Sequence, residues 1–203
     1  MAVPKLRFPH FKNGWNYNKL NKYLIENKTR NKGKVYSKED VLSVSGEYGV
    51  INQIVLQGRS FAGQSVELYH IVENDDVVYT KSPLKANPYG IIKRNGGNAG
   101  IVSTLYAVYH PTEYADSRFI EYYFSNDLRL NKYLKPLVNI GAKHDMKISN
   151  VKVISDFVSF PALEEQQKIA DFLTTFDKRI TAQQNIVADL EETKKGLLQK
   201  IFS

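Results

Sequence analysis

The stretch that decides the fold is residues 161–203, PALEEQQKIADFLTTFDKRITAQQNIVADLEETKKGLLQKIFS. Proline is tolerated in the first turn of a helix, and no proline follows Pro161. Glu164 and Glu165 suit the positive N-terminal end of a helix, and Lys200 suits the negative C-terminal end. The pattern therefore predicts one uninterrupted helix.

The apolar residues of this helix recur at alternating steps of four and three, once two polar positions are included. The resulting seam consists of Ile169, Leu173, Phe176, Ile180, Gln183, Val187, Leu190, Lys194, Leu197 and Ile201. A repeat of about five heptads is typical of a coiled coil, in which polar seam residues lower stability and often set register or partner.

The expected length of the helix indicates a partner. From about Leu163 to Ser203 it would extend roughly 60 Å, more than the diameter of the preceding body. Most of the apolar stripe would then need a second long helix to cover it. The alternative, a helix packed across its own domain, stays open at this point.

The amino-acid composition excludes several classes of protein. A chain of 203 residues with 42% hydrophobic residues can form one domain with an extension. Cysteine is absent, which excludes disulfides and thiolate metal sites and suits a reducing compartment. No apolar run reaches the roughly 20 residues that span a bilayer, and MAVPKLRFPHF lacks the apolar centre of a signal peptide. We expect a soluble cytoplasmic protein.

The positive charge is concentrated in the body. Residues 164–203 contain six Lys or Arg and seven Asp or Glu, so the first 163 residues hold 22 of the 28 basic and 14 of the 21 acidic residues. The first 34 residues carry nine basic side chains and only Glu26 as an acid. Such asymmetry is expected of a nucleic-acid-binding protein. A basic surface without that role would look the same.

The body begins with short strand-like runs between Gly, Ser, Asn and Asp residues. These runs are VLSV from Val41, GVINQIVL from Gly49, ELYHIV from Glu67 and DVVYTK from Asp76. YGIIKRNGGNAGIVSTLYAVYH, residues 89–110, reads as two strands around a Gly/Asn loop. GWNYNKLNKYLIENKTRNKGK, residues 14–34, is ambiguous between helix and strand and ends in a basic loop.

Helical patterns follow from Tyr114. Phe119, Ile120, Tyr123 and Phe124 share one helical face. A second helix, capped by Ser125, Asn126 or Asp127, would carry Leu128, Tyr133 and Leu134. The expected fold is α+β, with a mixed domain over residues 1–160 and the long helix over residues 161–203.

The terminal stretch closely resembles the helical region of type I restriction–modification DNA specificity subunits. The matching pattern is Glu165-Gln166, Lys168-Ile169-Ala170, Phe172-Leu173, Asp177 and Ile180, followed by Lys195-Gly196-Leu197-Leu198-Gln199. KLRFPHFKNGW resembles the entry to a target recognition domain, and VLSVSGEYGVINQ, DDVVYTKSP and GIVSTLYAVY resemble its strand signatures. The resemblance spans nearly the whole chain.

The resemblance implies a non-catalytic, sequence-specific binder of double-stranded DNA. Family members usually hold two recognition domains, each reading half of a bipartite site, and two antiparallel helices that set the spacing. Methyltransferase subunits dock around those helices, and a motor–nuclease restriction subunit joins them in restriction complexes. This chain departs from the pattern by having one domain and one helix, so it looks like half of a specificity subunit. A second copy, paired antiparallel, would supply the missing helix.

Other motifs argue against an enzyme. Asn87-Pro88-Tyr89 has one proline fewer than the Asn-Pro-Pro-aromatic motif of amino-methyltransferases, and NGGNAG, residues 95–100, is placed in an apparent hairpin. A turn is the better interpretation of Asn87-Pro88-Tyr89. No cofactor is expected. Glu192-Thr193-Lys194 has a nuclease-like form but lies on the coiled-coil helix. The histidines are scattered, so no metal site is expected: His10, His70, His110 and His144.

Candidate DNA contacts lie in loops with basic and amide side chains, because Arg and Lys can read guanine while Asn and Gln can read adenine. They are Lys28, Arg30, Lys32, Lys34, Arg59, Gln64, Lys81, Lys85, Asn87, Tyr89, Lys93, Arg94, Asn95 and Asn98. Phosphate contacts should outnumber base contacts, and some of these positions are expected to be ordinary solvated loop residues. The rival functions are a stand-alone dimeric DNA-binding regulator and a self-contained methyltransferase or nuclease.

Overall fold

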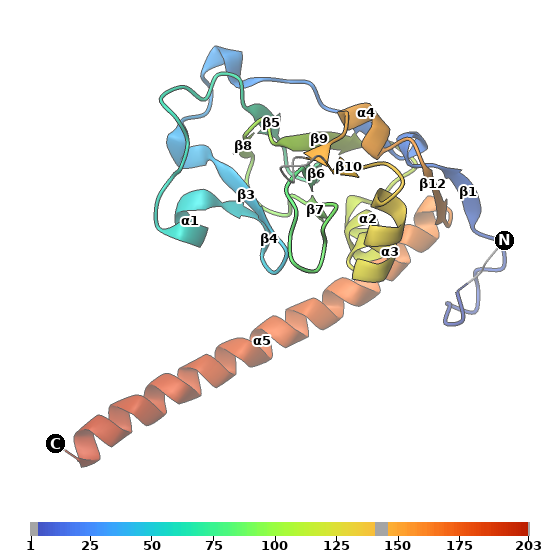
Figure 1. Cartoon of the computed structure of the whole chain (residues 1–203). Helices are drawn as coiled ribbons and strands as arrows, with labels where there is room; N and C mark the ends of the chain where they lie inside the picture. Colours follow the sequence, from blue (N-terminus) through green and yellow to red (C-terminus); the bar gives the residue numbers. More distant parts are fainter. Residues whose placement is uncertain (1–3, 141–145, 203) are drawn as a thin grey trace.

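A computed structural model describes residues 4–140 and 146–202, and it places a mixed α+β body at one end of a long projecting helix (Figure 1). The strands are β1 Asn16–Lys19, β2 Leu24–Glu26, β3 Leu42–Ser45, β4 Gly49–Asn52, β5 His70–Val72, β6 Val77–Thr80, β7 Ile92–Arg94, β8 Gly100–Val102, β9 Tyr106–Pro111, β10 Asn139–Ile140, β11 Met146–Lys147 and β12 Phe157–Phe160. The helices are α1 Gln53–Gln57, α2 Ser117–Phe124, α3 Asp127–Leu134, α4 Asn150–Val153 and α5 Leu163–Ile201, with short 3-10 turns η1 Leu20–Lys22, η2 Asn31–Gly33 and η3 Lys38–Asp40. The expected α+β class is confirmed.

A four-stranded antiparallel sheet in the order β2-β9-β6-β7 forms the centre of the body. Side chains alternate between its two faces. Val78 and its cross-strand partner Val108 pack with Val72 and Val102, on the side of β5 and β8. Tyr79 belongs to the larger core on the other side, which includes residues of α2, α3 and the start of α5. The sheet therefore separates β5 and β8 from α2, α3 and the start of α5.

The two short helices begin where polar side chains can accept hydrogen bonds from free backbone amides. Asp116 accepts from the amides of Arg118 and Phe119 at the start of α2, and Asn126 accepts from the amide of Arg129 at the start of α3. The predicted α2 face is confirmed, because Phe119, Ile120 and Phe124 are buried. The predicted second helix, α3, is confirmed, with Asn126 as its cap.

In α3 the buried leucine is Leu130, whereas Leu128 is 83% exposed. Leu130, Tyr133 and Leu134 lie three and four positions apart and so share a helical face, which leaves Leu128 on the opposite side.

The run from Gly49 is not one strand, as was predicted. It divides into β4 and α1 because the Asn52 side chain accepts hydrogen bonds from the amides of Ile54 and Val55. Gly58 then ends the helix with a φ of +77°, a conformation that glycine adopts without strain.

The run of residues 89–110 forms three strands, not two. Its Gly/Asn loop is not a hairpin, because β7 pairs with β6 whereas β8 pairs with β5. The ambiguous run near the N-terminus forms β1 and β2 around η1. The strand β12, which the sequence did not reveal, pairs antiparallel with β1.

The long helix is confirmed. It extends from Leu163 to Ile201, 39 residues, after Pro161 and the N-cap Ala162. Only its first turns lie against the body, beside α2, and the rest extends away from it (Figure 1). Among the described residues, no helix is both long and apolar enough to cross a membrane.

Candidate nucleic-acid interface and partner helix

Two basic loops of the body are brought together by hydrogen bonds and an ion pair. The Arg30 guanidinium donates to the carbonyl of Leu68 at 2.7 Å, and Lys34 forms an ion pair with Glu67 at 3.0 Å. Asn31, which is fully buried, donates to the carbonyl of Tyr36 at 2.8 Å and holds the first loop in shape. The segment containing Lys28, Arg30, Lys32 and Lys34 therefore lies against the loop that also carries Arg59 and Gln64.

Lys81 belongs to the same charged region although it is distant in sequence. Burial, then the positive charges of Arg30 and Lys81, lower the pKa of His70 to about 4. The pKa of Lys81 is lowered by burial and by Arg30, against an opposing effect of Glu26. Two cations therefore flank one buried, neutral imidazole.

Several side chains of this region reach solvent. Lys28, Lys32, Lys34, Arg59 and Gln64 are exposed. The Arg59 guanidinium stacks over the ring of Phe61 at 4.6 Å from its centroid, and the amide of Phe61 donates to Gln53 at 2.6 Å. The loop thus presents the Arg59 cation and the Phe61 ring to solvent, and the hydrogen bond to Gln53 fixes the backbone at Phe61.

Arg94 and Lys93 lie elsewhere, on the side of β7 that faces α2. Arg94 donates to Asp75 at 2.6 Å and to Ser117 at 3.1 Å. Burial raises the pKa of Glu121, and the charge of nearby Lys93 opposes that shift. Both cations therefore have acidic neighbours and lie beside α2.

Two residues that were predicted to contact DNA bases are instead hydrogen-bonded within the protein. Asn95 is 1% exposed, and its amide donates to the carbonyls of Glu73 and Asn98 while its oxygen accepts from the amide of Gly97. Asn87 is buried as well and donates to Asp127 at 2.9 Å. Neither side chain presents its donors to solvent, so we leave both out of the revised set of DNA contacts.

The remaining candidates flank these asparagines. Lys85 and Asn98 are exposed, whereas Tyr89 is half-buried against the main core and its carbonyl accepts from the Tyr79 hydroxyl at 2.7 Å. The turn predicted at residues 87–89 is confirmed, because the amide of Gly90 donates to the carbonyl of Asn87 at 3.0 Å.

Two buried polar residues anchor the start of α5, and sequence reasoning did not assign them this role. Glu165 is 2% exposed and accepts two hydrogen bonds of 2.6 Å from Arg7. Gln166 is fully buried; it donates to the carbonyls of Tyr114 and Pro161 and accepts from the amide of Asp116. A charged or amide side chain in the first turn of a predicted helix is usually solvated, so only the tertiary structure distinguishes these two.

The α2 helix holds the next two turns. Arg118 bridges Asp116 and Asp171 at 2.6 and 2.7 Å. The Tyr122 hydroxyl contacts Thr174 at 3.1 Å and donates to Asp177. These contacts set the direction in which α5 leaves the body.

Beyond Leu173 the seam is uncovered. Ile169 and Leu173 are partly buried, whereas the later members are exposed: Phe176, Ile180, Gln183, Val187, Leu190, Lys194, Leu197 and Ile201. Exposed apolar residues in a continuous stripe mark a site of association. The alternative of a helix packed across its own domain is thereby excluded.

The described residues contain no group of three His, Cys, Asp or Glu side chains arranged to hold a metal ion. Of the four histidines, His144 lies outside the described residues.

A family model described as the type I restriction modification DNA specificity domain matches residues 14–192. Solved structures with a similar fold include the HsdS subunit from Thermoanaerobacter tengcongensis, with 18% identity, a TM-score of 0.50, and coverage of 89% of this chain and 41% of that one. The S subunit of a type I restriction–modification system from M. genitalium has 16% identity, a TM-score of 0.56, and coverage of 89% and 43%.

A third similar structure comes from work on complex assembly and conformational transition of the type I R-M system. It has 16% identity, a TM-score of 0.55, and coverage of 97% of this chain and 46% of that one. At these identities the likeness shows a shared fold. The chain spans less than half the length of each of these structures.

Proposed function

The chain belongs to the type I restriction modification DNA specificity domain family, and from this premise we propose that it is a non-catalytic specificity module acting as half of a specificity subunit. Two copies would pair through antiparallel α5 helices and direct methyltransferase subunits, and in a restriction complex the motor–nuclease subunit, to a bipartite DNA site.

The observation that carries this proposal is the uncovered seam of α5. A helix of 39 residues is about 58 Å long, and α2 covers only its first turns. An exposed apolar stripe of this length is stable in water when a second helix covers it. An identical chain offers the same stripe, and an antiparallel pair has closed two-fold symmetry.

For DNA we propose the loop surface made by two segments, 28–34 and 59–69, together with Lys81. Its support is the exposure of Lys28, Lys32, Lys34 and Arg59 on two loops that the contacts of Arg30 with Leu68 and of Lys34 with Glu67 hold together. Such cations bind phosphates without sequence preference, and a smaller number of contacts reads bases. Lys85 and Asn98 are secondary candidates. The half-buried Tyr89, Lys93 and Arg94 are weaker ones.

Two-fold pairing has a consequence for the DNA site. Two identical recognition domains would read two identical half-sites in inverted orientation, with an unread spacer between them. The test is to co-express the chain with its cognate methyltransferase subunit and to map the methylated sites. Asymmetric half-sites from the homodimer would contradict the proposal.

Deleting one heptad tests whether α5 sets the spacing. Removal of Ile180–Ile186 keeps the seam in phase and shortens the helix by about 10 Å, or about three base pairs at 3.4 Å each. We expect unchanged half-sites with a shorter spacer, or loss of binding. A folded deletion variant that methylates sites with the original spacer would overturn this role of the helix.

Labelled S-adenosylmethionine separates this function from its rivals. The chain alone should transfer no methyl group to DNA, and adding the methyltransferase subunit should restore transfer at the mapped sites. Transfer by the chain alone would indicate an enzyme. DNA binding without any capture of the methyltransferase subunit would indicate a stand-alone regulator.

A further inference from the structure

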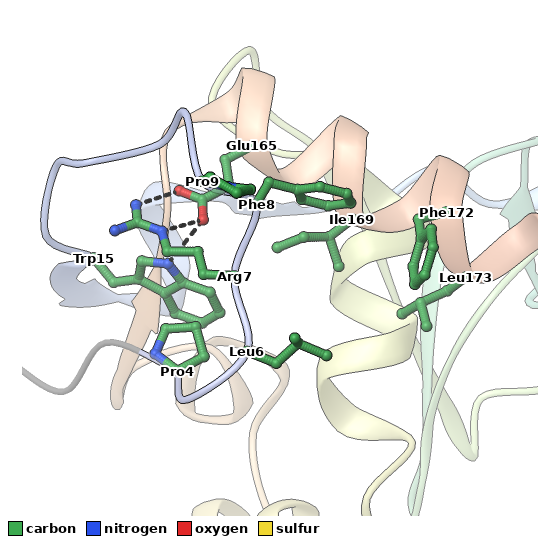
Figure 2. A pocket seen from close by; sticks show the side chains of 10 residues that line it. All are labelled: Pro4, Leu6, Arg7, Phe8, Pro9, Trp15, Glu165, Ile169, Phe172 and Leu173. Atoms are coloured by element: carbon green, nitrogen blue, oxygen red, sulfur yellow. Dashed lines mark hydrogen bonds and ion pairs between the residues drawn. The ribbon is translucent and has the colours of Figure 1, made fainter.

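The N-terminal segment and the start of α5 enclose an apolar cavity of about 340 Å³. Figure 2 shows Ile169, Phe172 and Leu173 pointing from α5 toward Leu6, with Trp15 along the adjoining wall. Phe8 closes the upper side and meets Phe172 edge-on, with ring centroids 5.7 Å apart. The walls therefore come from two segments that lie far apart in the sequence.

The cavity is suited to an apolar occupant. Leu6 is 88% exposed at its rim, so its apolar surface is open to solvent. The charged groups in its wall, Arg7 and Glu165, neutralise each other through their hydrogen bonds. An apolar group could enter without leaving a charge buried and unpaired, which would otherwise be costly.

The cavity is continuous with the α5 seam. The ring centroids of Phe172 and Phe176 are 5.0 Å apart. Ile180 is the next seam residue after Phe176. At the far end of the same helix, Ile201 is 67% and Phe202 is 81% exposed. One helix thus has an apolar hollow at its start and two projecting apolar side chains at its end.

An antiparallel pair brings these two ends together. When the two-fold axis passes midway between Gln183 and Val187, every seam position faces a seam position of the other helix. Ile169 then lies opposite the partner's Ile201, and Leu173 lies opposite the partner's Leu197. Among the described residues, a register shifted by a heptad in either direction matches fewer seam positions.

The flanks of the seam give this register one favourable contact and one unfavourable contact. Ile186, which is 51% exposed, would lie beside the partner's Ile186 at the two-fold axis and be covered there. Asp177 would lie near the partner's Glu191, a like-charge contact that is moderated because Tyr122 donates to Asp177.

We propose that the cavity between the N-terminal segment and α5 is a socket for Ile201 and Phe202 of a second copy of this chain. The proposal rests on the homodimer proposed above and adds its register and a role for the N-terminal segment. Each recognition domain would then hold both helices, its own by the first turns and the other by its far end.

Engineered cysteines test the contact directly, because the natural chain has none. Within one chain Leu6 and Phe202 lie at opposite ends of a helix about 58 Å long, whereas a disulfide needs Cα atoms roughly 4.4–6.8 Å apart. A disulfide between them must therefore join two chains. Chains carrying Leu6→Cys are mixed with differently tagged chains carrying Phe202→Cys and oxidised. The mixed disulfide is expected, and Val55→Cys on α1 in place of Leu6→Cys should give none.

A second measurement uses Trp15, the single tryptophan of the chain. Occupation of the socket should shift its emission to shorter wavelength as the protein concentration rises through dimer formation. Phe202→Asp should abolish that shift and raise the dimer dissociation constant by at least about tenfold. The matched control is Leu128→Asp, an exposed leucine on α3.

The outcomes distinguish the socket from the homodimer. A dimer in sedimentation that forms no mixed disulfide and shows no Trp15 shift overturns the socket and leaves the homodimer intact. Disulfides between two Phe202→Cys chains indicate parallel helices and overturn the socket. A wild-type chain that stays monomeric at micromolar concentration overturns both.

Discussion

Arg7 and Glu165 are 158 positions apart in the sequence, and two nitrogens of the Arg7 guanidinium donate to the two carboxylate oxygens of Glu165 at 2.6 Å each. The pKa of Arg7 is raised chiefly by this hydrogen bonding. Because Glu165 also accepts from the Trp15 indole at 3.4 Å, one carboxylate ties the N-terminal segment to the start of α5.

Arg7→Ala should destabilise the protein, because it leaves the buried Glu165 carboxylate without its cation. We expect the melting temperature to fall by several degrees. The double variant Arg7→Ala, Glu165→Gln should be more stable than Arg7→Ala alone, since it removes the uncompensated charge. A double variant that melts no higher than the single one would show that the ion pair has little weight at this position.

Gln166→Ala removes three hydrogen bonds and leaves two carbonyls and one amide near the helix start without partners. The free energy of unfolding should fall by about 2–4 kcal/mol, as measured by urea denaturation. Gln167→Ala, at the exposed neighbouring position, should change it by less than about 0.5 kcal/mol. Equal effects of the two variants would contradict the anchoring role of Gln166.

Binding of duplex DNA should weaken steeply with salt, because phosphate contacts release counterions. Replacing Lys28, Lys32 and Lys34 by alanine should flatten the slope of log affinity against log salt by about 0.9 for each lost contact. Lys168→Ala on α5 is the matched control and should leave the slope unchanged. A wild-type slope near zero between roughly 50 and 200 mM salt would refute the proposed surface.

Lowering the pH should destabilise the fold through His70. Its folded pKa of about 4 is below its ordinary value of 6.5, so the unfolded chain binds the proton more strongly. Stability is therefore full above pH 6.5 and is lost as the pH falls from 6.5 toward 4, by on the order of 3 kcal/mol. His70→Asn should lack this component of the pH dependence in urea titrations. A proton NMR titration that places the folded pKa near 6.5 would contradict the prediction.

Charges placed in the seam should separate the proposed dimer. Phe176→Asp, Ile180→Asp and Val187→Asp together would bury unpaired carboxylates between the helices, which is costly. Sedimentation should then show monomers at concentrations where the wild type is dimeric. Thr181→Asp, off the seam, should leave the dimer intact, and a dimer that survives the triple substitution would mean that another surface is used.

The sequence was most informative where a pattern is long. Five heptads identified α5 to within two residues at its C-terminal end, because a periodic stripe averages over local exceptions. Short segments were less determinate. The β-branched pair Ile54 and Val55 favours a strand, but the Asn52 cap and Gly58 produce one helical turn and a half instead.

The DNA surface was the part that could be predicted least. Asparagine is a good reader of adenine and also a good former of turns, and its residue type does not distinguish the two roles. Asn95 uses every polar atom of its side chain inside its own loop. Arg30 and Lys81 are distant in sequence and come near each other only because the strands beside them pair. No local sequence pattern specifies that pairing.

The short anchorage of α5 makes the helix a lever. Gln166, Arg118 and Tyr122 hold α5 near its N-terminal end, and its C-terminal end lies about 58 Å away. Each degree of tilt at the anchor would therefore displace that end by ~1 Å. The stiffness of the contacts made by these three side chains thus limits how accurately the C-terminal end of α5 is positioned. Small substitutions among them would widen the range of positions of that end while leaving the body folded.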